Sequence, residues 1–354
     1  MKLFRTSITF AMLLNLSGCG NSGSGSGGLN GPNEIPLTDT KNITFAPPVD
    51  VACLSPNEGV EGLRLSGKDV YNKGYQDLLI CRYPFATMNW EKVTSAAYLT
   101  TYQASDSGLF VERNGYVYFL PKVPFGAKEP VPELVGASRN PLDAEATFNL
   151  ATTQSGLAAL TIGNSTSFYK REPRPNSTSF QWKVSQTASP RYKDKLRMSG
   201  AGLYSLDDSG NTIGWIPVGG NGSQDLKCPG FCDEIAASED GLYVLSNKNV
   251  SKPEIYFFDS AANRSTVFEP TAGQWKNVYG IFASVHGVYV HYLRSDKKCV
   301  LSFITRDGRE VVVVESADYM QAVIANDGGA LVLQKDVTQP SPIWRYYEMR
   351  VKLN

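Results

Sequence analysis

The sequence predicts an all-β protein, a β-propeller of seven four-stranded blades whose ring is closed by an N-terminal strand. Three observations lead to this fold. A glycine followed by apolar residues returns seven times at intervals of 39 to 48 residues, aromatic strands follow six of the copies, and the last copy is one strand short of a blade. A period near 45 residues is typical of four-stranded propeller blades.

The composition agrees with a turn-rich β protein. The 354 residues include 32 glycines and 20 prolines, and 19% of them are charged, below the roughly 25% of an average soluble domain. Since 34 basic residues balance 34 acidic ones, no net charge draws the chain to nucleic acid. The only histidines, His286 and His291, leave little room for a metal centre or a catalytic relay. We therefore expect no cofactor, no metal site and no nucleic-acid partner.

The N-terminal segment is predicted to be a signal peptide. Lys2 and Arg5 precede the apolar run ITFAMLL, and LSGC, ending at Cys19, follows it. Only 13 residues separate Arg5 from Cys19, too few for a membrane span of about 20 residues. LSGC resembles the lipobox of bacterial lipoproteins. An ordinary secretory signal with a chance cysteine is the alternative.

The lipobox resemblance implies that residues 1–18 are cleaved and that Cys19 becomes the acylated first residue. Each buried methylene contributes about 0.8 kcal/mol, so two or three acyl chains hold a protein at a bilayer without a spanning helix. Gly20 follows the cysteine, which in enteric-type lipoproteins implies sorting to the outer membrane. Residues 19–41 include a Gly/Ser-rich run and are expected to form a flexible tether, with the propeller domain at 42–354.

Each blade is predicted from one copy of the glycine phrase. The copies begin at Gly62, Gly108, Gly156, Gly202, Gly241, Gly287 and Gly329. Around Gly287, VYGIFASV forms a first strand, GVYVHY a second, CVLSFITR a third and REVVVVE a fourth. The preceding unit repeats this plan with IAASEDGLYVLSN, EIYFFDS and STVFEP. We expect the glycine to provide positive φ in the tight link between the first two strands.

The end of the chain predicts how the ring closes. Only two strand candidates, ALVLQK and IWRYYEMR, follow the start of the last copy. NITFA, at residues 42–46, precedes the first complete blade and can supply the missing outer strand. Such closure removes an open sheet edge of the kind that invites aggregation.

Five cysteines lie beyond the lipobox. CPGFC places Cys228 and Cys232 on either side of a turn-forming Pro-Gly pair between the fourth and fifth blades, and we expect a disulfide there. A redox or metal pair is disfavoured, because the spacing is C-x3-C. Cys53 and Cys81 fall on first and third strands about 10 Å apart, which argues against a bridge unless one lies in a loop. Their pairing, and that of Cys299, stays open.

Two resemblances to known propellers carry no functional residues. SLDDSGNTIGW, at 205–215, resembles the Asp-box of sialidase-like propellers, but it has an extra residue before Gly210 and occurs once, so an ordinary β-turn explains it. Of Arg171, Arg174 and Arg191, two lie in a proline-rich outer link, which disfavours a sialidase triad. Assembly-factor lipoproteins with D-x-x-T-G turns resemble the chain in anchor and architecture alone.

One mouth of the channel is the predicted binding surface. It is ringed by the links from each outer strand to the next inner strand and by the loops between second and third strands. These links carry residue types that dominate interface hot spots, and we predict that a partner contacts Trp90, Arg139, Arg191, Tyr192, Trp275 and Tyr319. The alternative for the two tryptophans is packing between blades.

Two classes of function remain. The favoured one is a lipid-anchored cell-envelope protein, at the outer membrane, whose propeller binds a protein or glycan partner without catalysis. The alternative is an envelope enzyme, such as a glycan lyase, glycosidase or lactonase, with carboxylates in the channel. No catalytic residue is assigned, because spacing along the chain cannot bring acids from different blades together. An inward cluster of carboxylates would favour the enzyme, and a flat aromatic mouth would favour binding.

Overall fold

The computed structural model describes most of the chain from Leu37 to Met349, and every regular element in the described part is a β-strand. The described residues are 37–43, 64–66, 69–73, 79–84, 91–95, 99–124, 126–128, 130–138, 148–153, 155–177, 179–190, 195–220, 222–247, 252–316, 320–327, 329–334 and 343–349. The strands fall in one compact unit, which spans residues 32–354.

The strands form seven antiparallel four-stranded sheets, which confirms the predicted propeller. The first three blades are β2 (Arg64–Ser66), β3 (Asp69–Lys73), β4 (Leu79–Pro84) and β5 (Glu91–Ser95); β6 (Leu99–Ser105), β7 (Gly108–Arg113), β8 (Tyr116–Pro121) and β9 (Glu133–Ala137); and β10 (Phe148–Thr152), β11 (Ala158–Ile162), β12 (Ser165–Pro173) and β13 (Phe180–Ala188). The next two are β14 (Arg197–Ser199), β15 (Gly202–Leu206), β16 (Thr212–Pro217) and β17 (Gln224–Lys227); and β18 (Cys232–Ser238), β19 (Gly241–Ser246), β20 (Glu254–Asp259) and β21 (Arg264–Phe268). The last two are β22 (Trp275–Ser284), β23 (Gly287–Arg294), β24 (Cys299–Thr305) and β25 (Glu310–Ser316); and β26 (Met320–Asn326), β27 (Gly329–Gln334), β28 (Ile343–Met349) and β1 (Leu37–Ile43).

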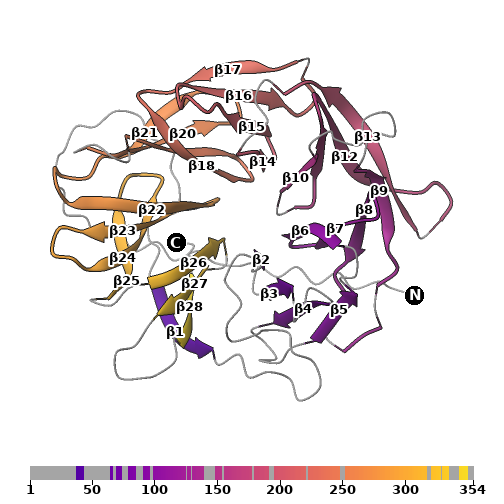
Figure 1. Ribbon diagram of the computed structural model, residues 1–354, viewed down its shortest axis with the longest axis horizontal. Helices are drawn as coiled ribbons and strands as arrows, with labels where there is room; N and C mark the ends of the chain where they lie inside the picture. Colours follow the sequence, from indigo (N-terminus) through magenta and orange to yellow (C-terminus); the bar gives the residue numbers. More distant parts are fainter. Residues whose placement is uncertain are drawn as a thin grey trace, which may run out of the picture. The chain divides into compact units, whose positions relative to one another are not determined.

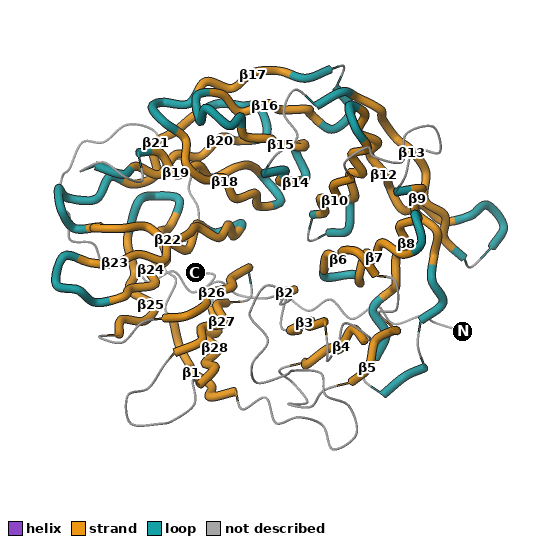
Figure 2. Tube along the Cα trace, viewed as in Figure 1, coloured by secondary structure: helices purple, strands orange, loops and turns teal. Residues whose placement is uncertain are grey.

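The first strands of the blades surround the centre of the ring. Each of β2, β6, β10, β14, β18, β22 and β26 contacts the first strands of both neighbouring blades, and the contact between β26 and β2 completes the circle. Figures 1 and 2 show these strands around the centre of the ring, with the fourth strands at the periphery. Residues on the first strands are therefore brought together from distant parts of the sequence.

The N-terminal strand closes the ring as predicted. β1 pairs antiparallel with β28, from Leu37 opposite Met349 to Ile43 opposite Trp344, and forms the outer strand of the last blade. The strand covers 37–43 rather than 42–46, so it begins inside the segment expected to be a tether. Residues 44–46 of the expected strand lie outside the described residues.

The first blade corrects one assignment of the repeat. The Arg64–Ser66 segment of the GLRL phrase forms the first strand, and the second strand begins at Asp69. Asp69 lies opposite Ser66, as Gly108 lies opposite Ser105 in the next blade. An aspartate therefore stands where five other blades have glycine, so a search for glycine does not locate the start of the second strand in this blade.

The repeated glycine is needed for space more often than for positive φ. A Cβ at Gly287 would lie 2.2 Å from the carbonyl oxygen of Ile304 and 2.6 Å from the Phe303 ring. An aromatic ring from the third strand covers the glycine in the same way at Gly108, Gly202, Gly241 and Gly329. Among the described members of the repeat, positive φ occurs only at Gly108, Gly156 and Gly329. The link between glycine and a following aromatic strand is therefore a packing contact.

A small polar residue closes the turn between the first and second strands. In the second blade, the Ser105 hydroxyl donates a hydrogen bond to the Gly108 carbonyl oxygen at 2.9 Å. Buried polar residues lie three positions before the start of the second strand in five further blades, at Ser66, Ser199, Ser238, Ser284 and Asn326. Because a buried turn must satisfy its backbone groups, this side chain fixes where the first strand ends.

Apolar side chains fill the space between neighbouring blades. Trp182 of β13 meets Phe110 and Phe119 of the second blade edge-on, with ring centroids 5.3 and 5.2 Å apart. A larger cluster joins the fifth and sixth blades. Burial of both faces of a sheet explains why aromatic and β-branched residues crowd these strands.

Candidate binding site in the central channel

Most of the residues predicted for partner binding lie outside the described part of the chain. They are Trp90, Arg139, Arg191, Tyr192 and Tyr319, and Cys19 of the lipobox lies outside it too. Their roles stay predictions.

Trp275 is described, and its side chain is only 3% exposed. Its ring stacks on Phe268 of the fifth blade at 5.4 Å and meets Tyr292 of its own blade at 5.0 Å. The structure thus places Trp275 in the core between two blades, which is the packing alternative left open by the sequence. A role for this ring in partner binding stays a prediction.

The predicted disulfide between Cys228 and Cys232 is present, with Cα atoms 5.8 Å apart. The backbone of this closed loop is held on two sides. The N–H of Cys232 donates to the Gly210 carbonyl at 2.7 Å, and the N–H of Asn247 donates to the Phe231 carbonyl at 2.8 Å. The bridge therefore fixes the link between the fourth and fifth blades.

The remaining cysteines differ in state. Cys81 lies on β4, the third strand of its blade, and is disulfide-bonded. Cys53 lies outside the described residues. Cys299 is buried and free.

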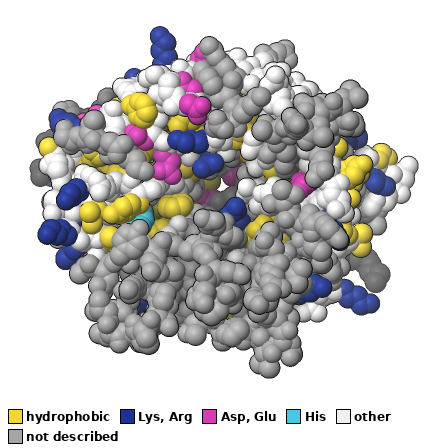
Figure 3. Space-filling view, in the orientation of Figure 1, with side chains coloured by type: hydrophobic (Ala, Val, Ile, Leu, Met, Phe, Trp, Pro, Cys, Tyr) yellow, Lys and Arg dark blue, Asp and Glu magenta, His cyan; other side chains and the backbone are white. Residues whose placement is uncertain are grey.

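The central channel contains a cavity of about 340 Å³. Five consecutive blades contribute a residue of their first strands to its wall: Arg64, Gln103, Thr152, Arg197 and Ala237. Leu150, Ala151, Leu196 and Met198 complete the described lining. The space-filling view shows an opening at the centre of the molecule, with both basic and acidic side chains near it (Figure 3). The size falls within the range of small-molecule sites, about 300 to 1,000 Å³.

Arg64 and Arg197 give the cavity its charge. The guanidinium of Arg64 lies 5.5 Å from the centroid of the Tyr102 ring. Arg197 donates from Nη1 to the Leu196 carbonyl at 3.0 Å. Burial lowers the pKa of Arg197, the carboxylate of Glu234 acts in the opposite direction, and the charge of Arg64 lowers the pKa further. Both guanidinium-bearing residues therefore contribute positive charge to the same wall.

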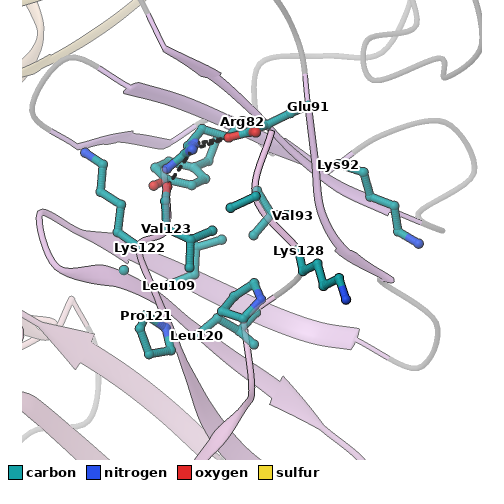
Figure 4. A pocket seen from close by; sticks show the side chains of 14 residues that line it. Arg82, Glu91, Lys92, Val93, Leu109, Leu120, Pro121, Lys122, Val123 and Lys128 are labelled. Atoms are coloured by element: carbon teal, nitrogen blue, oxygen red, sulfur yellow. Dashed lines mark hydrogen bonds and ion pairs between the residues drawn. The ribbon is translucent and has the colours of Figure 1, made fainter. Parts of the chain in front are cut away.

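A second, smaller cavity lies between the first two blades (Figure 4). Arg82 forms an ion pair with Glu91 and donates from Nη2 to the Val123 carbonyl at 2.9 Å. The other oxygen of Glu91 accepts the backbone N–H of Gly126 at 2.8 Å. The space is about 20 Å³, enough for about one water molecule. This network joins the two blades, and its cavity is too small for a ligand larger than water. The channel cavity is therefore the candidate binding site.

Two further properties bear on function. The described residues contain no group of three or more His, Cys, Asp or Glu side chains placed to hold a metal ion. In the same part of the chain, no helix has the length and apolar character needed to cross a bilayer.

Comparison with known proteins shows the fold alone. No family model and no curated protein matches the sequence. The WD40 domain of SCAP from fission yeast is similar in structure, with a TM-score of 0.50 and 10% identity over 91% of this chain and 92% of that one. An oligogalacturonate lyase in complex with manganese gives a TM-score of 0.51 and 12% identity over 90% and 98% of the two chains.

An acylaminoacyl peptidase of Pyrococcus horikoshii aligns with 82% of this chain at a TM-score of 0.51 and 11% identity. The match covers 51% of the peptidase, so the chain spans about half the length of that protein. Both a WD40 domain and enzymes are thus similar in fold, and at these identities the likeness carries no activity.

Proposed function

We propose that this protein is a lipid-anchored cell-envelope binding module, at the outer membrane, whose propeller holds a glycan or protein partner without catalysis. The observation that carries the binding role is the cavity of about 340 Å³ in the channel. Its wall combines guanidinium, amide and hydroxyl groups with apolar surface, as in sites that bind small polar ligands or a protruding part of a larger partner.

The character of the lining favours binding over hydrolysis. Most glycosidases use a pair of Asp or Glu side chains on either side of the scissile bond. Among the described lining residues there is no carboxylate, and the charged members are Arg64 and Arg197. Because no aromatic residue lines the described wall either, recognition in the channel depends on charge and hydrogen bonding.

The binding role is tested by filling the cavity. Ala237→Trp should abolish calorimetric binding of cell-envelope mono- and disaccharides, because the indole would occupy the space of the ligand. Val312→Trp, at an outer-strand position that is 47% exposed, is the matched control and should bind as the wild type does. Thr152→Phe, at another wall position, covers the case in which Ala237→Trp does not fold. Wild-type binding by both channel variants, with unchanged melting, would contradict the proposal.

The membrane anchor rests on the LSGC sequence at Cys19. Cys19→Ser should leave an unprocessed precursor without acyl label, because the thiol is the atom that receives the lipid. Ser22→Ala, three residues further on, should be labelled and processed normally. Metabolic labelling with a fatty acid measures both, and lipid on the mature Cys19→Ser protein would overturn the anchor.

A further inference from the structure

The outer strand of the third blade differs from the other outer strands. β13 has nine residues, whereas the outer strands of the other six blades have four to seven. β11 pairs with β12 only as far as Tyr169, but β12 and β13 remain paired beyond it, as far as Pro173 and Phe180. Residues 170–173 and 180–183 therefore form a two-stranded ribbon that continues past the rest of the blade, at the periphery of the ring (Figure 1).

Contacts with both neighbouring blades hold β13 in place. Glu133 of β9 accepts hydrogen bonds from Arg171 Nε at 2.9 Å and from Trp182 Nε1 at 3.1 Å. Near the other end of β13, the Gln186 side chain donates to the Pro217 carbonyl oxygen of the fourth blade at 3.0 Å. A two-stranded hairpin alone is marginally stable in water, so these contacts make β13 a rigid strand that is already ordered for binding.

The outer edge of β13 is open among the described residues. β12 is the one described strand that pairs with it, so the backbone N–H and C=O groups of its other edge face outward. Val184 is 52% exposed and Phe180 is 39% exposed, and both lie on one face of the strand because they are four positions apart. The Arg171 guanidinium, 3.8 Å from the centroid of the Phe180 ring, holds that ring. Apolar surface therefore adjoins this edge.

The charges on the ribbon favour an acidic partner. Residues 165–188 include one acidic side chain, Glu172, and four basic ones, Lys170, Arg171, Arg174 and Lys183. The Glu172 carboxylate lies 3.2 Å from the Lys183 ammonium, but Lys170 lies directly opposite Lys183 in the sheet register. Like charges at opposed positions of a sheet repel. One carboxylate therefore serves two ammonium groups on this face, and a further carboxylate would relieve their repulsion.

We infer that the outer edge of β13 binds an extended segment of a partner protein in which apolar and acidic residues alternate. Backbone hydrogen bonds add such a segment to the sheet as a further strand. Because successive side chains of a strand point to opposite faces, its apolar residues contact Phe180 and Val184. Its carboxylates lie on the other face, beside Lys170 and Lys183. A second copy of the chain is disfavoured, since it brings its own lysines to this edge.

The probe is a labelled octapeptide in which valine and glutamate alternate, and an alternating valine–lysine peptide is its charge control. Fluorescence polarisation at low salt should show about tenfold tighter binding of the glutamate peptide. Lys170→Glu should weaken that binding about fivefold, because it replaces an attraction by a repulsion. Lys227→Glu, at an exposed position of the outer strand β17, is the matched control and should bind as the wild type does.

The apolar face has its own pair of variants. Val184→Ser should weaken binding of the glutamate peptide about threefold, because it removes apolar surface that the peptide covers. Val312→Ser, at an exposed position of the outer strand β25, should leave the affinity unchanged. Ala237→Trp, in the channel, should also bind the peptide as the wild type does, since the edge of β13 is a site separate from the cavity.

Methylation of the peptide backbone tests strand addition. One peptide carries methyl groups on its valine nitrogens and another on its glutamate nitrogens, so each lacks the donors of one edge. We expect one of them to lose binding and the other to retain it, because a strand pairs with its neighbour through a single edge. Full binding by both methylated peptides would overturn the inference.

Other results would also overturn it. They are equal affinity for the glutamate and lysine peptides, and binding that Lys170→Glu and Val184→Ser both leave unchanged while melting stays at the wild-type temperature. If the glutamate peptide does not bind, the inference is wrong. Dimers in sedimentation that Val184→Ser dissociates would then identify a second copy as the occupant. Binding to phosphatidylglycerol vesicles that Lys170→Glu abolishes would instead identify a membrane.

Discussion

Deletion of residues 37–43 destabilises the whole propeller. β1 completes the last blade through its pairing with β28, so the deletion removes one strand and exposes the edge of β28. The lost backbone hydrogen bonds and cross-strand contacts should cost about 3 to 5 kcal/mol of unfolding free energy. Thermal melting followed by circular dichroism measures the effect.

Deletion of residues 22–28 is the matched control of equal length. This segment belongs to the expected tether and is composed of glycine and serine alone, so melting should not change. Equal melting temperatures for the two deletions would contradict closure of the ring by β1.

Gly287→Ala should destabilise the sixth blade by about 3 kcal/mol, the upper part of the range for overpacked cores. The new methyl group would lie 2.2 Å from the Ile304 carbonyl oxygen and 2.6 Å from the Phe303 ring. A backbone oxygen cannot move aside as a flexible side chain can, so the sheet must distort. Chemical denaturation measures the loss.

Gly280→Ala, in the same blade, is the control. Its added Cβ would come no closer than 3.6 Å to any neighbour, and the φ angle of Gly280 is not positive. The expected change is therefore small. If both variants lose the same stability, the close approach of Phe303 does not explain the repeat.

The sequence predicts the blades well because one packing contact recurs in them. Glycine at the start of the second strand and an aromatic residue on the third touch each other, so both must be kept, and their spacing reveals the period. The contact is absent from the first blade, where Asp69 replaces glycine and the glycine phrase falls on the first strand. It is also absent from the third blade, where the second strand begins at Ala158 and Gly156 lies against Ser107. The polar residue three positions earlier, Ser66 in the first blade, would have given the correct alignment.

The site is harder to predict because it is assembled across blades. Arg64 and Arg197 are 133 positions apart, and neither stands out in a chain with equal numbers of basic and acidic residues. Only their shared position, two residues before the serine that ends a first strand, relates them. An alignment of the repeats on this serine would have revealed the shared position. Trp275 shows a different problem, because a large aromatic residue in a predicted link can equally well pack in the core between blades.

The location of the ligand is the central claim of this account. Amide chemical-shift changes in labelled protein titrated with cell-envelope mono- and disaccharides test it most directly. We predict that the largest changes fall on β2, β6, β10 and β14, around Arg64 and Arg197. Binding in the channel would be contradicted if the changes were confined to the links between blades, such as the disulfide loop from Cys228 to Cys232, with none on the first strands.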